Sequence, residues 1–149
     1  MIALIQRVTM ARVTVDGRMC GAIGAGLLAL IGVERADGPP EAMRLLERLL
    51  DYRVFADDAG RMNRSLRDTA GGLLLVPQFT LAADTSSGTR PGFQAAAEPA
   101  RARDLFEQLL VAARQAHPEV AAGEFGAHME VSLTNNGPVT FWLESGPKA

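Results

Sequence analysis

Two short segments of the chain place polar groups at the end of a predicted strand, and both consist largely of backbone donors and acceptors. The first is Gln78-Phe79-Thr80, after the apolar run 73–76, and the second is Asn136-Gly137-Pro138, after the alternating run 129–133. Thr80 has the only hydroxyl of the first segment, and a nucleophilic hydroxyl needs an adjacent base. No such base is evident in the sequence, so we predict that Thr80 positions a substrate. A site formed by these segments would act mainly through main-chain N–H and carbonyl groups.

The more familiar catalytic and ligand-binding patterns are missing from the sequence. No Gly-x-Gly-x-x-Gly motif follows a predicted strand, and no phosphate-binding loop ends in Lys-Ser/Thr. His117 and His128 have no cysteine cluster beside them, so we expect no metal site and no cofactor. His117 stands at a predicted helix end, where we expect it to cap the helix or to face solvent. Cys20 is the only cysteine, which excludes an internal disulfide, and we predict a buried structural thiol.

Composition and charge restrict the classes of function. The 149 residues, 48% of them hydrophobic and 21% charged, suit a single domain, residues 1–149, with a sizeable core. A formal net charge of -2 argues against a protein that grips a long nucleic-acid backbone, although it leaves open the recognition of one nucleotide end. The N-terminal segment has no signal-peptide pattern, and no apolar run reaches the roughly 18 residues of a membrane span. We therefore expect a cytoplasmic protein that contacts neither membrane nor DNA.

Apolar periodicity predicts the elements that position the two polar segments. Strands are predicted at 2–8, 11–15, 19–23, 27–33 and 73–76, with a turn at Asp16-Gly17 between the second and the third. Amphipathic helices are predicted to begin near Pro39 and at Pro99, and the second ends before Pro118. Successive strands with two long helices predict an α+β fold, in which a largely antiparallel β-sheet carries both helices on one face.

The segment 129–143 carries the signals of a β-hairpin. Apolar residues alternate with polar ones on both sides of Asn136-Gly137, a dipeptide that favours tight hairpin turns. Pro138 lacks a backbone N–H and therefore belongs at the first residue of a strand, at an edge or at a bulge. We expect this Gly-Pro turn to present its carbonyl groups in unusual directions.

Four segments together resemble the D-aminoacyl-tRNA deacylase family, and the resemblance runs along the whole chain. They are MIALIQRV (1–8), VPQFTLAADT (76–85), FGAHMEV (125–131) and LTNNGPVTFWL (133–143). The family's signatures are a Ser-Gln-Phe-Thr-Leu run and an Asn-x-Gly-Pro-Val-Thr run. The second is present, whereas the first has Pro77 in place of Ser, so a role that depends on that serine is absent here. His128 and Asn136 stand where Asp is common, which removes two negative charges near a tRNA end.

The resemblance implies a homodimer that hydrolyses the ester joining a D-amino acid to the 3′ end of aminoacylated tRNA. It also implies a cis peptide at Gly137-Pro138, whose carbonyls reach into the other subunit's site and exclude L side chains. A site that selects by rejecting L side chains makes no demand on the D side chain, so broad tolerance of D-amino acids is expected. Activity on glycyl-tRNA is expected as well, because glycine has no side chain to reject. The resemblance implies that Gln78, Phe79 and Thr80 form the catalytic wall of this site, with N–H groups around Phe79 and Thr80 that bind the oxyanion. The substrate is implied to contact Asn136, Gly137, Pro138 and Phe79. Arg7 is implied to support the Gly-Pro segment from behind.

Several alternatives remain open at the level of the sequence. A related group of animal tRNA deacylases has Pro at position 77 but Ala in place of Phe79, and its chirality is relaxed. A deacylase of mischarged L-alanyl-tRNA is thus one alternative, although Phe79 and the Val139-Thr140 pair favour the D-specific group. A non-catalytic nucleotide- or nucleic-acid-binding module is another. Two single residues have equal alternatives to the roles that the resemblance implies. For Phe79 the alternative is packing in the core, and for Arg7 it is a surface position or a salt bridge.

Overall fold

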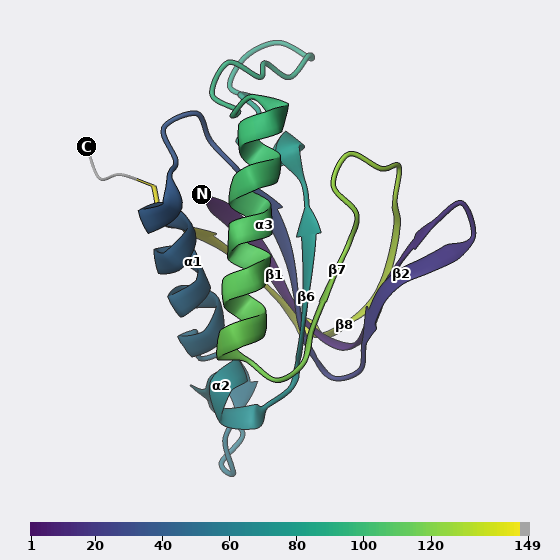
Figure 1. Cartoon of the computed structure of the whole chain (residues 1–149). Helices are drawn as coiled ribbons and strands as arrows, with labels where there is room; N and C mark the ends of the chain where they lie inside the picture. The colour runs from purple at the N-terminus through teal and green to yellow at the C-terminus, as the bar shows by residue number, and fades with distance from the viewer. Residues whose placement is uncertain (147–149) are drawn as a thin grey trace.

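The sheet of this protein is built around its first strand. The computed structural model describes residues 1–146, in which β1 pairs with three other strands and two long helices cover one sheet face (Figure 1). The elements are β1 (Ile2–Val15), β2 (Arg18–Ile23), β3 (Gly26–Gly32), α1 (Pro39–Asp51), β4 (Phe55–Ala56), β5 (Met62–Arg64), α2 (Leu66–Thr69), β6 (Gly72–Pro77), the 3₁₀ turn η1 (Phe79–Ala82), α3 (Pro99–Ala116), β7 (Val120–Ala122) and β8 (Glu130–Glu144).

The strand order is β2-β1-β3-β6-β7, and β8 pairs with the free side of β1. The pairs that β1 forms with β2, β3 and β8 are antiparallel, whereas β3–β6 and β6–β7 are parallel. The turn predicted at Asp16-Gly17 is confirmed, because both residues have a positive φ and join β1 to β2. The predicted α+β class is confirmed, with a parallel extension of the sheet beyond β3.

Two apolar clusters hold the sheet and the helices together. The helix-side cluster joins α1 and α3 to the inward-facing residues of β1, β3 and β6, and its largest fully buried members include Ile5, Ile31, Leu45, Leu49, Leu73 and Leu75. The opposite sheet face has a smaller cluster of buried residues: Val8, Ala11, Val13, Ile23, Leu28, Leu74 and Val76. The first half of β1 therefore serves the helix-side cluster through Ala3 and Ile5, and its second half serves the opposite cluster through Val8, Ala11 and Val13.

The predicted hairpin at 129–143 is wrong. β8 runs from Glu130 to Glu144 as one strand, and both of its halves pair with β1. Asn135 pairs with Val8 and Thr140 pairs with Gln6, so the four residues 136–139 lie opposite Arg7 alone. The Asn-Gly-Pro segment is thus a bulge in a strand. Alternation and Asn-Gly are shared by hairpins and interrupted strands, and the length of β1 lets the chain resume the same pairing after the interruption.

Two further expectations need correction. His117 is the C-cap residue of α3, but its ring is buried, not solvated, and its Nε2 lies 2.6 Å from the carbonyl oxygen of Gly71. Cys20 lies in β2 and is only half-buried. None of the helices within residues 1–146 has the length and apolar character needed to cross a membrane.

Candidate functional site

A pocket of about 450 Å³ opens where β6 ends. Its walls come from the end of β6, from η1, from the beginning of α3 and from the segment that leads into β8. The lining is Val76, Pro77, Gln78, Phe79, Ala97, Pro99, Ala102, Phe125, Gly126, Ala127, His128, Met129 and Val131. This lining is mainly apolar, and His128 is its only ionisable side chain. Such a cavity suits a small organic group that is oriented by a few polar contacts.

The turn after β6 is anchored from its first residue. The backbone N–H of Gln78 donates to the carbonyl oxygen of Ile31 at 2.7 Å, which ties η1 to the end of β3. Gly32 lies directly against this turn, because a β-carbon on it would be 2.9 Å from the Cβ of Leu81. The absence of a side chain at Gly32 therefore allows η1 to pack onto the strand.

Two backbone donors at this turn are left without partners. Within residues 1–146, the N–H groups of Phe79 and Thr80 have no acceptor, whereas that of Gln78 is occupied by Ile31. The opening residues of a helical turn have no earlier carbonyl to bond with. These are the N–H groups to which the resemblance assigned the binding of an oxyanion, a role that stays a prediction.

The side chains of the same segment divide between the pocket and solvent. Gln78 and Phe79 line the pocket, while Thr80 is exposed and does not contribute to the lining. Its hydroxyl accepts a short hydrogen bond from the side-chain amide of Gln78. Phe79 is 60% exposed and its ring centroid lies 5.2 Å from that of Phe93. Core packing is therefore excluded for Phe79, and its ring is available to a ligand.

Arg7 holds the second polar segment from behind. Its Nε donates to the carbonyl oxygen of Asn136 at 3.0 Å, and its Nη1 donates to the carbonyl oxygen of Val54 at 2.7 Å. The Gly137-Pro138 bond that follows is cis, and Gly137 has a φ of 143°. Arg7 thus contacts backbone carbonyls, and it takes part in none of the ion pairs within residues 1–146.

Asn135 closes the bulge, a role that was not predicted from the sequence. Its Oδ1 accepts from the backbone N–H of Val139 at 3.0 Å, and its Nδ2 donates to the hydroxyl of Thr140 at the same distance. An Asn side chain that bonds to the backbone a few residues ahead is a common device of tight turns, and this property was the available signal. Asn136, which was predicted instead, contributes its carbonyl oxygen.

The two segments do not meet within one chain. Asn136, Gly137 and Pro138 are all exposed and none of them lines the pocket. Gln78 is bonded to Ile31, which pairs with Ala3 on β1, whereas the bulge lies opposite Arg7. Ala3 and Arg7 are four positions apart on β1, which corresponds to about 13 Å along the strand. Within one chain, the bulge and the pocket are therefore separate features.

Phe125 and His128 line the pocket, although neither was predicted from the sequence as a site residue. Both belong to the segment 125–131, which carried part of the resemblance.

In the loop after η1, hydrogen bonds from the side chain and backbone of Ser86 hold the pKa of Asp84 below its usual value. Within residues 1–146, no three His, Cys, Asp or Glu side chains are grouped as a metal ion would require.

Comparison with known sequences points to one family. Residues 4–144 match the family described as D-Tyr-tRNA(Tyr) deacylase. The chain is 65% identical over 147 residues to a D-aminoacyl-tRNA deacylase of Herminiimonas arsenicoxydans, and the alignment covers 99% of each chain. It is 64% identical to the protein of the same name from Thioalkalivibrio sulfidiphilus, again over 99% of each chain.

Solved structures show the same arrangement of elements. The c-Myc DNA Unwinding Element Binding Protein superposes with a TM-score of 0.94 at 36% identity, covering 99% of this chain and 100% of that one. A probable eukaryotic D-amino acid tRNA deacylase superposes with a TM-score of 0.84 over 96% of this chain and 98% of that one. Its identity is 15%, so this second likeness supports the fold alone.

Proposed function

The chain belongs to the D-Tyr-tRNA(Tyr) deacylase family, and we propose that it removes D-amino acids from tRNA at a site completed by a second copy of itself. It is a hydrolase of the ester bond of aminoacyl-tRNA, as its full-length relatives are. The observation that carries the proposed site is the pair of unpartnered N–H groups of Phe79 and Thr80, within residues 1–146, beside an apolar pocket.

These two N–H groups suit the stabilisation of a developing oxyanion. Ester hydrolysis passes through a tetrahedral intermediate with negative charge on the former carbonyl oxygen. Each preorganised donor directed at that oxygen lowers the barrier by roughly 3 kcal/mol. Gln78 fixes the hydroxyl of Thr80, and Phe79 offers an exposed ring for the terminal adenosine. The ester is already activated, so water assisted by the terminal ribose hydroxyl suffices as nucleophile without a catalytic side-chain base.

Chirality would be selected by the backbone of the bulge. In this proposal the carbonyl groups of the Gly-Pro segment of a second copy face the α-carbon of the substrate, accept a hydrogen bond from its ammonium group and block an L side chain. Arg7 supports this role, because its guanidinium holds the preceding carbonyl in one orientation. Rejection of L side chains places no demand on the D side chain. The proposed substrates therefore include many D-aminoacyl-tRNAs and glycyl-tRNA.

A homodimer and a cytoplasmic location complete the proposal. The homodimer is supported by the distance between the bulge and the pocket within one chain. The location is supported by the substrate, because aminoacylated tRNA is consumed by translation in the cytoplasm.

The test is the release of amino acid from four substrates. Purified protein is incubated with D-tyrosyl-tRNA, L-tyrosyl-tRNA, glycyl-tRNA and L-alanyl-tRNA under one set of conditions. We expect rapid release of D-tyrosine and glycine, with L-tyrosyl-tRNA and L-alanyl-tRNA left intact. If D-tyrosyl-tRNA stays intact, the proposal is refuted, and the remaining alternative is a non-catalytic module that binds nucleotides or nucleic acid. Release of L-alanine would instead favour the chirality-relaxed deacylase.

A further inference from the structure

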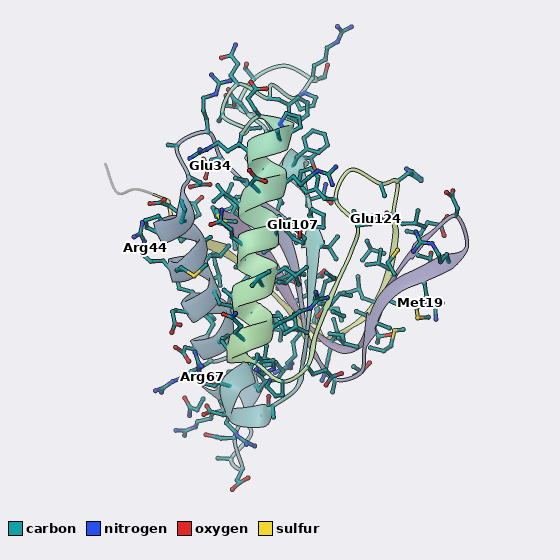
Figure 2. All side chains as sticks on the ribbon, in the orientation of Figure 1. Met19, Glu34, Arg44, Arg67, Glu107 and Glu124 are labelled. Atoms are coloured by element: carbon teal, nitrogen blue, oxygen red, sulfur yellow. The ribbon has the colours of Figure 1, made fainter. Side chains whose placement is uncertain are left out.

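A second, polar groove adjoins the pocket on the side of α3 that faces β2 and β7. Its volume is about 360 Å³. The arginine groove, as we call it, is lined by Arg18, Met19, Cys20, Arg103, Phe106, Glu107, Leu110, Arg114, Ala122, Gly123, Glu124 and Phe125. Figure 2 labels one residue on each side of it: Met19 on β2, Glu107 on α3 and Glu124 on the loop after β7. The proposed ester site makes no use of this groove.

The arginine groove is continuous with the pocket through Phe125, which lines both. The guanidinium carbon of Arg103 lies 4.9 Å from the centroid of the Phe125 ring. A terminal nitrogen of Arg103 also comes within 3.4 Å of the position that a β-carbon on Gly126, a pocket residue, would occupy. Arg103 therefore stands at the junction between the two cavities.

Helical periodicity places the remaining charges along the same groove. Arg103, Glu107 and Arg114 all line it from α3, and eleven residues of helix separate the two arginines, or about 16 Å. Arg18 reaches it from β2 and forms an ion pair with Glu124 at 3.1 Å. Neither Arg103 nor Arg114 belongs to an ion pair within residues 1–146. Two guanidinium groups are thus available, with the carboxylate of Glu107 between them.

We propose that the arginine groove binds the backbone phosphates of the RNA strand that leads to the aminoacylated 3′ end. This inference rests on the proposed function, because the strand runs along the groove only when its terminal ester occupies the pocket. A guanidinium fork matches the geometry of a phosphate group. A positive groove that ends at exposed aromatic rings is a common design for single-stranded nucleic acid. The net charge of -2 indicates that only a few phosphates are held, and that they are held locally.

The test compares a full substrate with one that lacks phosphates. D-tyrosyl-tRNA and D-tyrosyl-adenosine are hydrolysed by the native enzyme, by the double variant Arg103→Gln/Arg114→Gln and by the control Arg44→Gln/Arg61→Gln. The control removes the same charge from α1 and from the end of the β4–β5 turn, outside the groove. Loss of two charge-assisted contacts raises KM for D-tyrosyl-tRNA about tenfold or more. KM for D-tyrosyl-adenosine should change far less, and the control should resemble the native enzyme with both substrates.

Two further measurements sharpen the expectation. Each phosphate contact on a single strand contributes about 0.7 to the slope of log KM against log salt concentration, so the double variant should lose about 1.4 of that slope. Glu107→Gln removes the carboxylate between the two arginines. This variant should therefore lower KM for D-tyrosyl-tRNA, a gain that a merely structural role for Glu107 would not produce.

The outcomes separate this inference from the proposed function. If the native enzyme hydrolyses neither substrate, the proposed function fails, and the groove is then judged by fluorescence anisotropy with labelled tRNA and the same variants. If the double variant loses both substrates equally, or loses neither, the phosphate groove is refuted. An equal loss in the control would show a general charge effect and would refute it as well.

Discussion

At the scale of single residues, the candidate site is unusual in relying on the main chain. The free N–H groups of Phe79 and Thr80, within residues 1–146, and the carbonyl of Asn136 are its most directed polar groups, and side chains serve to place them. Arg7 bonds to two carbonyls, Asn135 bridges the bulge, and Gln78 occupies the hydroxyl of Thr80. Substitutions of these residues should therefore act mainly by displacing backbone.

Thr80→Ala should retain most of the activity. The side chain of Thr80 does not line the pocket, and its hydroxyl is hydrogen-bonded by the Gln78 amide, which cannot take up its proton. The backbone N–H of residue 80 is unchanged by the substitution. We expect kcat/KM for D-tyrosyl-tRNA to fall by less than about tenfold, or 1.4 kcal/mol. Complete loss of activity in a folded variant that still binds substrate would instead identify Thr80 as the nucleophile.

Gly137→Ala should impair both rate and selectivity. A β-carbon at this position would lie 2.6 Å from the Cγ2 of Val139 and 2.9 Å from its backbone nitrogen, at a φ of 143°. The bulge must shift to relieve these contacts, and we expect a loss of about 10- to 100-fold in kcat/KM for D-tyrosyl-tRNA.

The matched control for this variant is Gly60→Ala. Gly60 also has a positive φ, but no atom lies within 4 Å of the position that a β-carbon on it would take, and it belongs to the turn between β4 and β5. The ratio of D- to L-tyrosyl-tRNA hydrolysis is measured for both variants. An unaltered ratio in Gly137→Ala would show that the bulge does not distinguish D- from L-aminoacyl-tRNA.

Arg7→Lys should lower kcat more than it raises KM. Arginine reaches the carbonyls of Asn136 and Val54 with two different nitrogens, and a single ammonium group cannot reproduce this fork. We expect about a tenfold loss in kcat with weakened rejection of L-tyrosyl-tRNA. Arg12→Lys, at an exposed position of the same strand, is the control. Equal behaviour of the two variants would show that charge alone matters at position 7.

At the scale of elements, capped turns and helices hold the scaffold in place. The pKa of Glu41 is lowered by the backbone N–H of Gly38 at the start of α1, and the pKa of Asp68 is lowered by the backbone N–H of Ser65 at the start of α2. The pKa of Asp57 is lowered by the side chain of Asn63 and by backbone N–H groups in the β4–β5 turn. These carboxylates favour the folded state only while they are ionised.

The thermal midpoint should therefore fall in acid. A carboxyl group whose pKa is lower in the folded than in the unfolded chain stabilises the fold above its ordinary pKa, which is 4.5 for Glu41 and 3.8 for Asp68. This stability is lost as the pH falls through the folded-state pKa. The pKa of Glu34 is instead raised, first by burial and then by the charge of Asp37. Its contribution to stability therefore changes with pH in the opposite direction.

Calorimetry between about pH 6 and pH 3 checks this expectation, with the double variant Glu41→Gln/Asp68→Asn beside the native chain. The variant should show a smaller fall in midpoint over that range. Asp58→Asn, which removes a carboxylate of the β4–β5 turn, serves as the control. The explanation fails if the double variant and the native chain lose the same number of degrees.

At the scale of the whole molecule, the pocket and the bulge lie on different parts of one chain. The pocket opens at the end of β6, whereas the bulge lies in β8, opposite Arg7, at the edge of the sheet. A two-fold axis that brings the bulge of one copy to the pocket of the other would produce two identical sites, as an isologous dimer requires.

Mixing two impaired variants tests this arrangement. Phe79→Ala disables the pocket and Gly137→Ala disables the bulge, so a heterodimer of the two contains one site with both parts intact. Co-refolding equal amounts forms half heterodimers, and activity should return to about a quarter of the native value. Each variant refolded alone is the control. If no activity returns although heterodimers are recovered with two different affinity tags, the two parts of a site come from the same chain.

Sequence patterns predicted the fold class and most of the long elements, and they singled out the two polar segments that are proposed as the site. Periodicity located β3, α1 and α3, and it located β1 as two separate strands, 2–8 and 11–15, which the structure joins into one. Each of these elements buries one face or both, and burial leaves a regular apolar pattern. The Gln78-Phe79-Thr80 and Asn136-Gly137-Pro138 segments stood out because they interrupt such patterns with polar and turn-forming residues.

The conformation and the neighbours of these segments follow from the tertiary structure. It turned the expected hairpin into a bulge, because β1 is long enough to pair with both halves of β8. It placed His128 and Phe125 in the pocket and brought Arg18 of β2 to the groove that Arg103 and Arg114 line from α3. These contacts join residues that are distant in sequence, and such pairings depend on strand order and helix placement, which local patterns do not encode.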